Sequence, residues 1–169
     1  MFCKKVGKVE DCNKEVIVMS KGTLCCSHLT KEDIDIDLIK IFIDTEKELG
    51  QNIQVNSGAR CIECNASVGG KLNSAHLVLK DKKCKAFDIN DQSDKMMNLY
   101  IYLCNRKVNS LERFKMLKIS LELDPGMHLL IFKLLEKGVN RFGIAKSWFH
   151  FDIGKQEDGY SQNVVWMYD

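Results

Sequence analysis

Three residues far apart in the sequence are of the types that bind a catalytic zinc ion. His76 follows a polar loop, Asp88 is flanked by apolar residues, and His150 is flanked by aromatic ones. A carboxylate among apolar side chains is costly to bury unless it is paired or bound to a cation. Two imidazoles and one carboxylate form a common catalytic zinc set, because they leave a fourth position for water. The residue types therefore favour a metal site, although each histidine taken alone also fits a structural role.

Cysteines form a second group with possible metal chemistry. The sequence contains eight of them, and Cys61 and Cys64 form a C-x-x-C motif. Together with Cys25, Cys26 and His28, this motif could build a structural zinc site of thiolates and one imidazole. The even number also permits disulfides, but the N-terminus shows no secretory signal, which favours thiols in a reducing compartment. A redox role for the motif is less favoured, because no thioredoxin-like pattern surrounds it.

Composition limits the classes of function. A length of 169 residues, a single proline and no linker predict one domain over residues 1–169. The net charge of +2, with scattered lysines, argues against binding nucleic acid through its phosphates. No apolar run is long enough to span a bilayer. We expect synthesis in the cytoplasm, with release by lysis or transport in a phage particle if the target lies outside the cell.

The residues around the candidate ligands resemble a known family. Residues 57–70 read S-G-A-R-C-I-E-C-N-A-S-V-G-G, followed by N-S-A-H-L at 73–77, A-F-D-I at 86–89 and F-H-F-D at 149–152. Over roughly residues 35–155 this pattern is similar to the zinc D-alanyl-D-alanine peptidases. That group includes vancomycin-resistance dipeptidases and carboxypeptidases, phage endolysin peptidases and murein endopeptidases, and it shares its metal site with the hedgehog signalling domain.

The resemblance implies a role for each matching residue. His76, Asp88 and His150 would be the zinc ligands of a peptidase that hydrolyses peptide bonds in peptidoglycan. The residues with catalytic or substrate-binding roles would be Arg60, Ser74 and Asp152, and Trp148, one of the aromatic residues that flank His150, could line the substrate cleft. Arg60 would face the substrate and hold a peptide carbonyl or a developing oxyanion. Asp152 would orient a ligand or take protons during hydrolysis, and Ser74 would contact the substrate.

The sequence departs from the family pattern in three places. The segment between the first histidine and the aspartate, residues 77–87, is about five residues longer than usual, and a hairpin at Lys80–Lys83 would absorb the excess. Cys84 replaces the usual glycine there. Ser147 stands where many members carry an acidic catalytic residue, so Asp152 is the first substitute as base and His128 a weaker one.

Ser147 keeps two other functions open beside a peptidoglycan endopeptidase or D,D-carboxypeptidase. One is a non-catalytic zinc fold used for binding, as in the hedgehog domain. The other is an intracellular dipeptidase acting on D-Ala-D-Ala. The small size, and a composition rich in lysine, isoleucine and asparagine, favour a phage or prophage origin.

The elements that must position these residues alternate between strands and helices. Strands are predicted at 15–19, 53–56, 84–89, 141–145, 148–153 and 163–168. Helices are predicted from Thr30 to a stop at Gly50, and at 61–68, 91–106 and 127–137, whereas residues 111–123 are ambiguous. Because the late strands cluster, we expect an α+β fold with a central, mostly antiparallel sheet flanked by helices and a zinc cleft.

Overall fold

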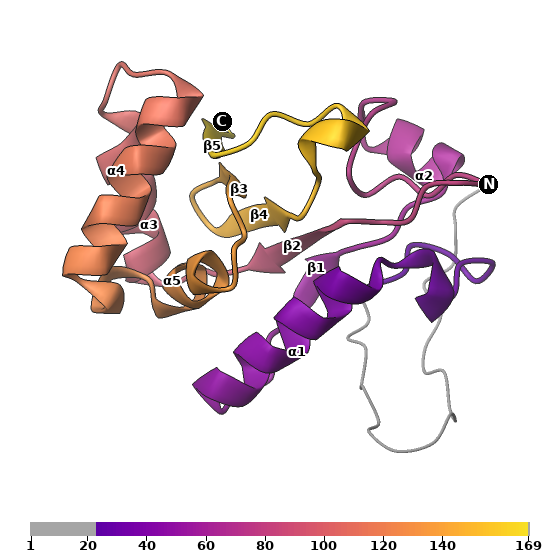
Figure 1. Cartoon of the computed structure of the whole chain (residues 1–169), viewed down its shortest axis with the longest axis horizontal. Helices are drawn as coiled ribbons and strands as arrows, with labels where there is room; N and C mark the ends of the chain where they lie inside the picture. Colours follow the sequence, from indigo (N-terminus) through magenta and orange to yellow (C-terminus); the bar gives the residue numbers. More distant parts are fainter. Residues whose placement is uncertain (1–22, 169) are drawn as a thin grey trace.

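A five-stranded sheet forms the centre of the computed structural model, which describes residues 23–168 (Figure 1). The strand predicted at 15–19 lies outside these residues. The strand order is β1-β2-β4-β3-β5, and every pair is antiparallel except β3 with β5. The bounds are β1 Val55–Ser57, β2 Ala86–Asn90, β3 Arg141–Ile144, β4 Trp148–Asp152 and β5 Val164–Met167. The α+β class and the mostly antiparallel sheet are thus confirmed.

The two faces of the sheet differ in chemistry. Because side chains alternate along a strand, Phe87 and Phe151 point to one face while Asp88 and His150 point to the other. The aromatic face belongs to the hydrophobic core, and the core also includes apolar residues of the helices α1, α3, α4 and α5. The polar residues of β2 and β4 therefore collect on the opposite face.

Five α-helices of the described segment surround the sheet. Their bounds are α1 Ile36–Leu49, α2 Ile62–Ser67, α3 Asp94–Cys104, α4 Ser110–Leu123 and α5 Leu129–Glu136. Figure 1 shows α3 and α4 at one end of the molecule and the short α2 at the other. Among residues 23–168, no helix combines the length and the apolar character that crossing a membrane requires.

The first helix begins later than the sequence predicted. Thr30 and Asp33 form a capping box, but it closes only a 3-10 turn, Lys31–Asp33. Ile34 then pairs with Cys84 in an isolated β-bridge, so the chain is extended there. The helix α1 starts after Asp35, whose side chain accepts a hydrogen bond from the Asp37 N–H. Its end at Gly50, which has a positive φ of 62°, agrees with the prediction.

The segment between His76 and Asp88, which is longer than in the family pattern, contains a tight turn. Leu79 and Lys82 form an antiparallel bridge through two backbone hydrogen bonds of 2.9 and 3.1 Å. On either side of this turn, Leu77 pairs with Arg60 and Cys84 pairs with Ile34. The extra residues therefore project as a hairpin, and the ends of the segment remain in place.

Candidate metal centre

His76, Asp88 and His150 converge on one point. The Nε2 atom of His76 lies 3.1 Å from Oδ1 of Asp88 and 3.0 Å from Nδ1 of His150, and the latter two atoms are 2.9 Å apart. Asp88 and His150 are direct partners across β2 and β4, so the register of the sheet brings them together. His76 comes from the loop before the hairpin and joins them from one side.

The partners of the two imidazoles determine which ring nitrogens are free to coordinate. Nδ1 of His76 donates to the carbonyl oxygen of Gly58 at 2.8 Å, because a carbonyl can only accept. Nε2 of His150 donates to Oδ2 of Asp152 at 3.0 Å, because an ionised carboxylate can also only accept. In the neutral rings, the nitrogens that face Asp88 therefore carry lone pairs. Such outer hydrogen bonds are typical of histidines that bind metal ions.

This donor set fits a metal ion. Three electron-rich atoms separated by about 3 Å repel one another unless a cation or a proton lies among them. A cation can lie about 2.0–2.1 Å from all three atoms of such a triangle, which is the usual distance of zinc from nitrogen and oxygen ligands. All three residues are buried, with exposed fractions of 3% for His76, 7% for Asp88 and 5% for His150.

The electrostatics of the cluster also favour a positive charge at its centre. Burial lowers the pKa of His76. Burial alone would also lower the pKa of His150, but hydrogen bonds with Asp152 and Asp88 raise it to about 9. Burial alone would raise the pKa of Asp88, yet His76 and His150 hold that pKa well below its usual range. The cluster therefore favours an ionised Asp88 carboxylate with a positive charge beside it, which either a proton on His150 or a metal ion bound to the neutral rings can supply.

Arg60 contacts the second oxygen of the same carboxylate. Its Nη2 donates to Oδ2 of Asp88 at 2.7 Å, and its Nε donates to Oγ of Ser57 at 2.9 Å. The Arg60 side chain is 16% exposed, so part of it reaches the surface beside the cluster. The charge-assisted pair leaves Oδ1 of Asp88 facing the histidines.

Asp152 is more deeply buried than the three candidate ligands, with 1% of its surface exposed. Oδ2 accepts from His150, whereas Oδ1 accepts from Nε of Arg141 at 2.6 Å and from the Gly154 N–H at 2.9 Å. Burial alone would raise the pKa of Asp152, but His150 and Arg141 hold it below its usual value. Both oxygens are thus engaged, and the side chain contacts the His150 nitrogen that does not face Asp88.

The two other predicted site residues lie close to the ligands. Oγ of Ser74 accepts from the backbone N–H of His76 at 3.3 Å. Trp148 lies two residues before His150 on β4, and therefore on the same face of the sheet. Its ring is tilted against that of Tyr168, with centroids 4.5 Å apart. The ring of Trp166 lies 5.2 Å from that of His150, so aromatic side chains flank the third ligand.

His128, the weaker candidate for a base, lies under the other face of the sheet. Its ring packs against Phe149, a residue of the apolar face, at a centroid distance of 5.6 Å. Its Nδ1 accepts from the Ile131 N–H at the start of α5, and its Nε2 lies 3.1 Å from Oδ2 of Asp91. Because the sheet separates it from His150, His128 has a structural position.

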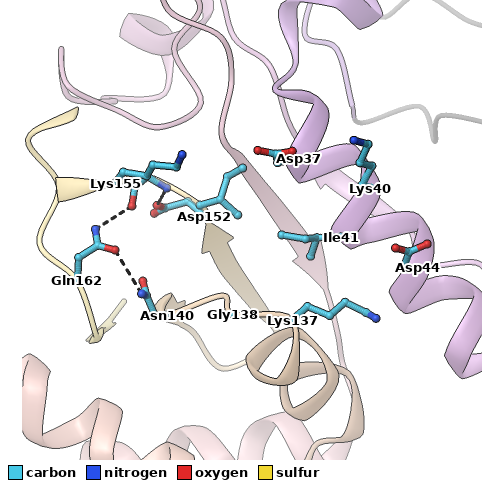
Figure 2. Close-up of a pocket in the computed structure, with 12 residues that line it drawn as sticks. Asp37, Lys40, Ile41, Asp44, Lys137, Gly138, Asn140, Asp152, Lys155 and Gln162 are labelled. Carbon is cyan, nitrogen blue, oxygen red and sulfur yellow. Dashed lines mark hydrogen bonds between the residues drawn. The ribbon is translucent and has the colours of Figure 1, made fainter. Parts of the chain in front are cut away.

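A hollow of about 500 Å³ lies beside the centre without including any of the three ligands (Figure 2). It lies between α1, the start of β3 and the chain after β4. Its lining includes Asp37, Lys40, Asn140, Asp152, Lys155 and Gln162. Asp152 is the residue common to both places: one oxygen contacts His150, and the other accepts the Gly154 N–H at the wall of the hollow.

Three parts of the centre were missed by reasoning from the sequence. Arg141 is a charged residue at the start of a predicted strand, and that unusual position was a usable signal. Trp166 lies in the last predicted strand with no motif around it. The carbonyl of Gly58 leaves no mark in the side-chain pattern, although Gly58 belongs to the S-G-x-R segment.

Comparison with curated proteins and with solved structures yields no match. A sequence model of the family described as Peptidase M15 matches residues 10–116, which is more than half of the chain. The matched segment contains Arg60, His76 and Asp88 and ends before β3, so the match does not reach His150, which the structure places beside Asp88. The chain belongs to the Peptidase M15 family of metallopeptidases.

Proposed function

We propose that this protein is a zinc-dependent peptidase that hydrolyses peptide bonds in the stem or cross-link of peptidoglycan, as a phage or prophage lysis protein would. The observation that carries the proposal is the convergence of His76, Asp88 and His150 with their free lone pairs directed at one point. Two imidazoles and one carboxylate leave a coordination position open, as catalytic zinc sites do. Membership of a metallopeptidase family supports the same chemistry.

The metal would supply Lewis-acid chemistry: zinc in such a site polarises a carbonyl and makes water nucleophilic at neutral pH. The residues of the chain hold and orient the site. Gly58 and Asp152 fix the tautomers of His76 and His150 through the outer ring nitrogens. Arg60 holds one oxygen of Asp88 so that the other faces the histidines.

We assign substrate contacts to Arg60, Trp148 and Ser74. The guanidinium of Arg60 has five N–H donors, and the contacts with Ser57 and Asp88 account for two of them. A peptide carbonyl or a developing oxyanion beside Asp88 is a suitable acceptor for another. Trp148, half-buried on the face of His150, offers an aromatic wall for an extended peptide. Ser74, whose Oγ also accepts from the backbone N–H of His76, would present its hydroxyl to the substrate beside that histidine.

Asp152 is proposed as a positioning residue. Its two oxygens are occupied by His150, Arg141 and Gly154, which favours orientation of His150 over the proton transfer that the sequence also allowed. A carboxylate that accepts from a ligand imidazole raises the basicity of that ligand and fixes its ring.

The test combines metal content with hydrolysis on one purified sample of the full chain. Zinc per chain, release of peptides from sacculi and cleavage of D-Ala-D-Ala are measured for the wild type, His150→Ala and His28→Ala. His28 is an exposed histidine outside the cluster and serves as the matched control. We expect the wild type and His28→Ala to cleave sacculi, and His150→Ala to lose cleavage together with one zinc ion.

Other outcomes would select a different function. Cleavage of D-Ala-D-Ala without attack on sacculi would make the protein a dipeptidase. Zinc lost in His150→Ala, but no turnover by the wild type on either substrate, would favour the binding module. Ser147, exposed and lacking a carboxylate, is the feature that motivates this second candidate. Zinc and turnover unchanged in His150→Ala would overturn the metal centre itself.

A further inference from the structure

Four cysteine sulfurs gather in a second cluster outside the centre described above. The Sγ atoms of Cys25, Cys26, Cys61 and Cys64 all lie within 4.8 Å of one another. Cys61 caps the N-terminus of α2 and Cys64 lies one turn later, while Cys25 and Cys26 belong to the segment that precedes α1. Figure 1 shows α2 at the end of the molecule remote from α3 and α4. All six cysteines among residues 23–168 are thiols.

The spacing of these sulfurs suits a single ion. Zinc binds thiolates at about 2.3 Å, so in a tetrahedral site the sulfurs are separated by about 3.8 Å. A separation of at most 4.8 Å, with Cys25 and Cys26 at 3.2 Å, is close to that value. Four soft thiolate ligands in a tetrahedral arrangement select zinc among the common divalent ions.

The surroundings of the sulfurs are those of thiolates held by a metal. The Cys61 N–H is directed at Sγ of Cys25, and the Cys64 N–H at Sγ of Cys61, each at 3.4 Å. Hydrogen bonds from backbone amides to sulfur stabilise thiolates. Cys26 and Cys61 are buried, with 4% and 6% exposed, while Cys25 and Cys64 are half-buried. The two buried cysteines thus shield the middle of the cluster from solvent, while an ion can reach it past the half-buried Cys25 and Cys64.

We propose that Cys25, Cys26, Cys61 and Cys64 bind a second, structural zinc ion as four thiolates. His28 was the alternative fourth ligand in the sequence, and its Nε2 lies 3.4 Å from Sγ of Cys26. It flanks the cluster, whereas the four sulfurs already supply as many ligands as a tetrahedral zinc site takes. The site is independent of the catalytic proposal, because it shares no residue with the His76, Asp88 and His150 cluster.

This ion would fasten the segment that supports the catalytic centre. Residues 23–25 pair with residue 59 through two backbone hydrogen bonds of 2.8 and 3.0 Å. A methyl group added at Gly58 would lie 2.4 Å from the carbonyl oxygen of Thr23, so the two segments are in close contact. The carbonyl of Gly58 orients His76, and Arg60 adjoins Cys61 and holds Asp88. An ion that joins Cys25 to Cys61 would therefore hold residues 58–60 in place. It would thereby also hold the contact of Gly58 with His76 and the contact of Arg60 with Asp88.

The experiment measures zinc and iron per chain by elemental mass spectrometry in the full protein, purified under reducing conditions. The samples are the wild type, His150→Ala, Cys64→Ser, His28→Ala and Cys104→Ser. Cys104 is an exposed cysteine on α3 and is the matched control. We expect two zinc ions in the wild type, His28→Ala and Cys104→Ser, and one in His150→Ala and in Cys64→Ser.

A second measurement does not depend on a cysteine variant that folds. X-ray absorption at the zinc edge of His150→Ala should show four sulfur neighbours at about 2.3 Å. Fewer sulfur neighbours with nitrogen present, iron in place of zinc, or no metal in His150→Ala together with disulfides would each overturn the proposal. Loss of zinc from His28→Ala would overturn the assignment of four thiolates. If the wild type holds only the cysteine zinc and cleaves nothing, the catalytic proposal alone fails.

Discussion

The carboxylate of Asp152 accepts a hydrogen bond from Nε2 of His150 at 3.0 Å, through the ring nitrogen that does not face Asp88. Both residues lie on β4, two positions apart, so the alternation of the strand places them on one face. Arg141, the partner of Asp152 across β3 and β4, holds the carboxylate from the other side. One strand pair therefore supplies a candidate metal ligand, the carboxylate that orients its ring and the guanidinium that holds that carboxylate.

Replacement of Asp152 by asparagine should weaken metal binding more than catalysis. Loss of an outer partner of a metal-binding histidine usually costs about 10- to 100-fold in metal affinity. We expect that loss in a zinc competition titration, with kcat at saturating zinc within about 10-fold of the wild type. Asp158→Asn, at an aspartate paired with Lys85, is the control. A fall in kcat beyond about 100-fold with zinc bound would instead assign proton transfer to Asp152.

Replacement of Arg60 by lysine should affect turnover and leave the metal in place. Lysine can keep the charge beside Asp88 but cannot contact Asp88 and Ser57 together or hold a carbonyl as a planar fork. We expect kcat/KM to fall by about 10²–10³ at unchanged zinc content, the range found for a lost oxyanion donor. Ser57→Ala removes only the Nε partner and should change kcat/KM little. An Arg60→Lys protein with wild-type kcat/KM would show that the arginine only pairs with Asp88.

Trp148 should contribute to substrate binding. Truncation to alanine removes the ring beside Tyr168 on the face of His150. We expect KM to rise about 10-fold, since aromatic contacts contribute about 0.5–1.5 kcal/mol each beyond buried area. The conservative Trp148→Phe variant should restore most of the affinity. A lower melting temperature with unchanged KM in Trp148→Ala would assign the ring to packing alone.

The pairing of Asp91 with His128 should make stability depend on pH in acid. The contact with His128 lowers the pKa of Asp91 well below its usual value. A carboxyl group with a lowered pKa stabilises the folded state above its unfolded pKa of about 3.9, and that contribution is lost as the pH falls through the folded pKa. Asp91→Asn should therefore lower the free energy of unfolding at pH 7 by about 1–3 kcal/mol.

The pH dependence of the Asp91→Asn variant tests the direction of this effect on stability. The difference in unfolding free energy between the wild type and Asp91→Asn, measured by urea titration, should shrink steadily below about pH 4. Asp81→Asn, at the exposed tip of the hairpin, should show no such convergence. A difference that stays constant down to pH 2 would mean that the Asp91 carboxylate is not held in its ionised form by His128.

Local sequence patterns were sufficient to predict most of the helices and strands. The strands that carry Asp88 and His150 were predicted because apolar residues flank each of them in a short run. The helix α4 stayed ambiguous because Leu111 and Ile119 are apolar but exposed, which blurs the buried stripe of Phe114, Leu117 and Leu121. The late start of α1 was missed because the β-bridge of Ile34 involves a residue fifty positions away.

The sequence was sufficient to propose the residues of the candidate site, but it was not sufficient to predict their contacts. The three candidate ligands were predicted from their types and from the family pattern, which needs no knowledge of register, and the structure brings the three side chains together. The partners of those ligands depend on which strands adjoin and in what register, and this is decided by packing over the whole chain. The contact of Asp152 with Arg141 exists only because β3 pairs with β4, and the contact of His76 with Gly58 involves a backbone atom.

The metal centre draws its ligands from widely separated parts of the chain. His76 and Asp88 precede three helices, and His150 follows them, 74 and 62 residues later. A nascent polypeptide cannot assemble this triad until α3, α4 and α5 have been made and β4 has inserted between β2 and β3. Contacts of such long range form late in folding, because the entropy of closing the loop must be overcome first. The convergence of His76, Asp88 and His150 therefore requires β4 to be paired with β2, and a partly synthesised chain that ends before β4 lacks the third residue of the cluster.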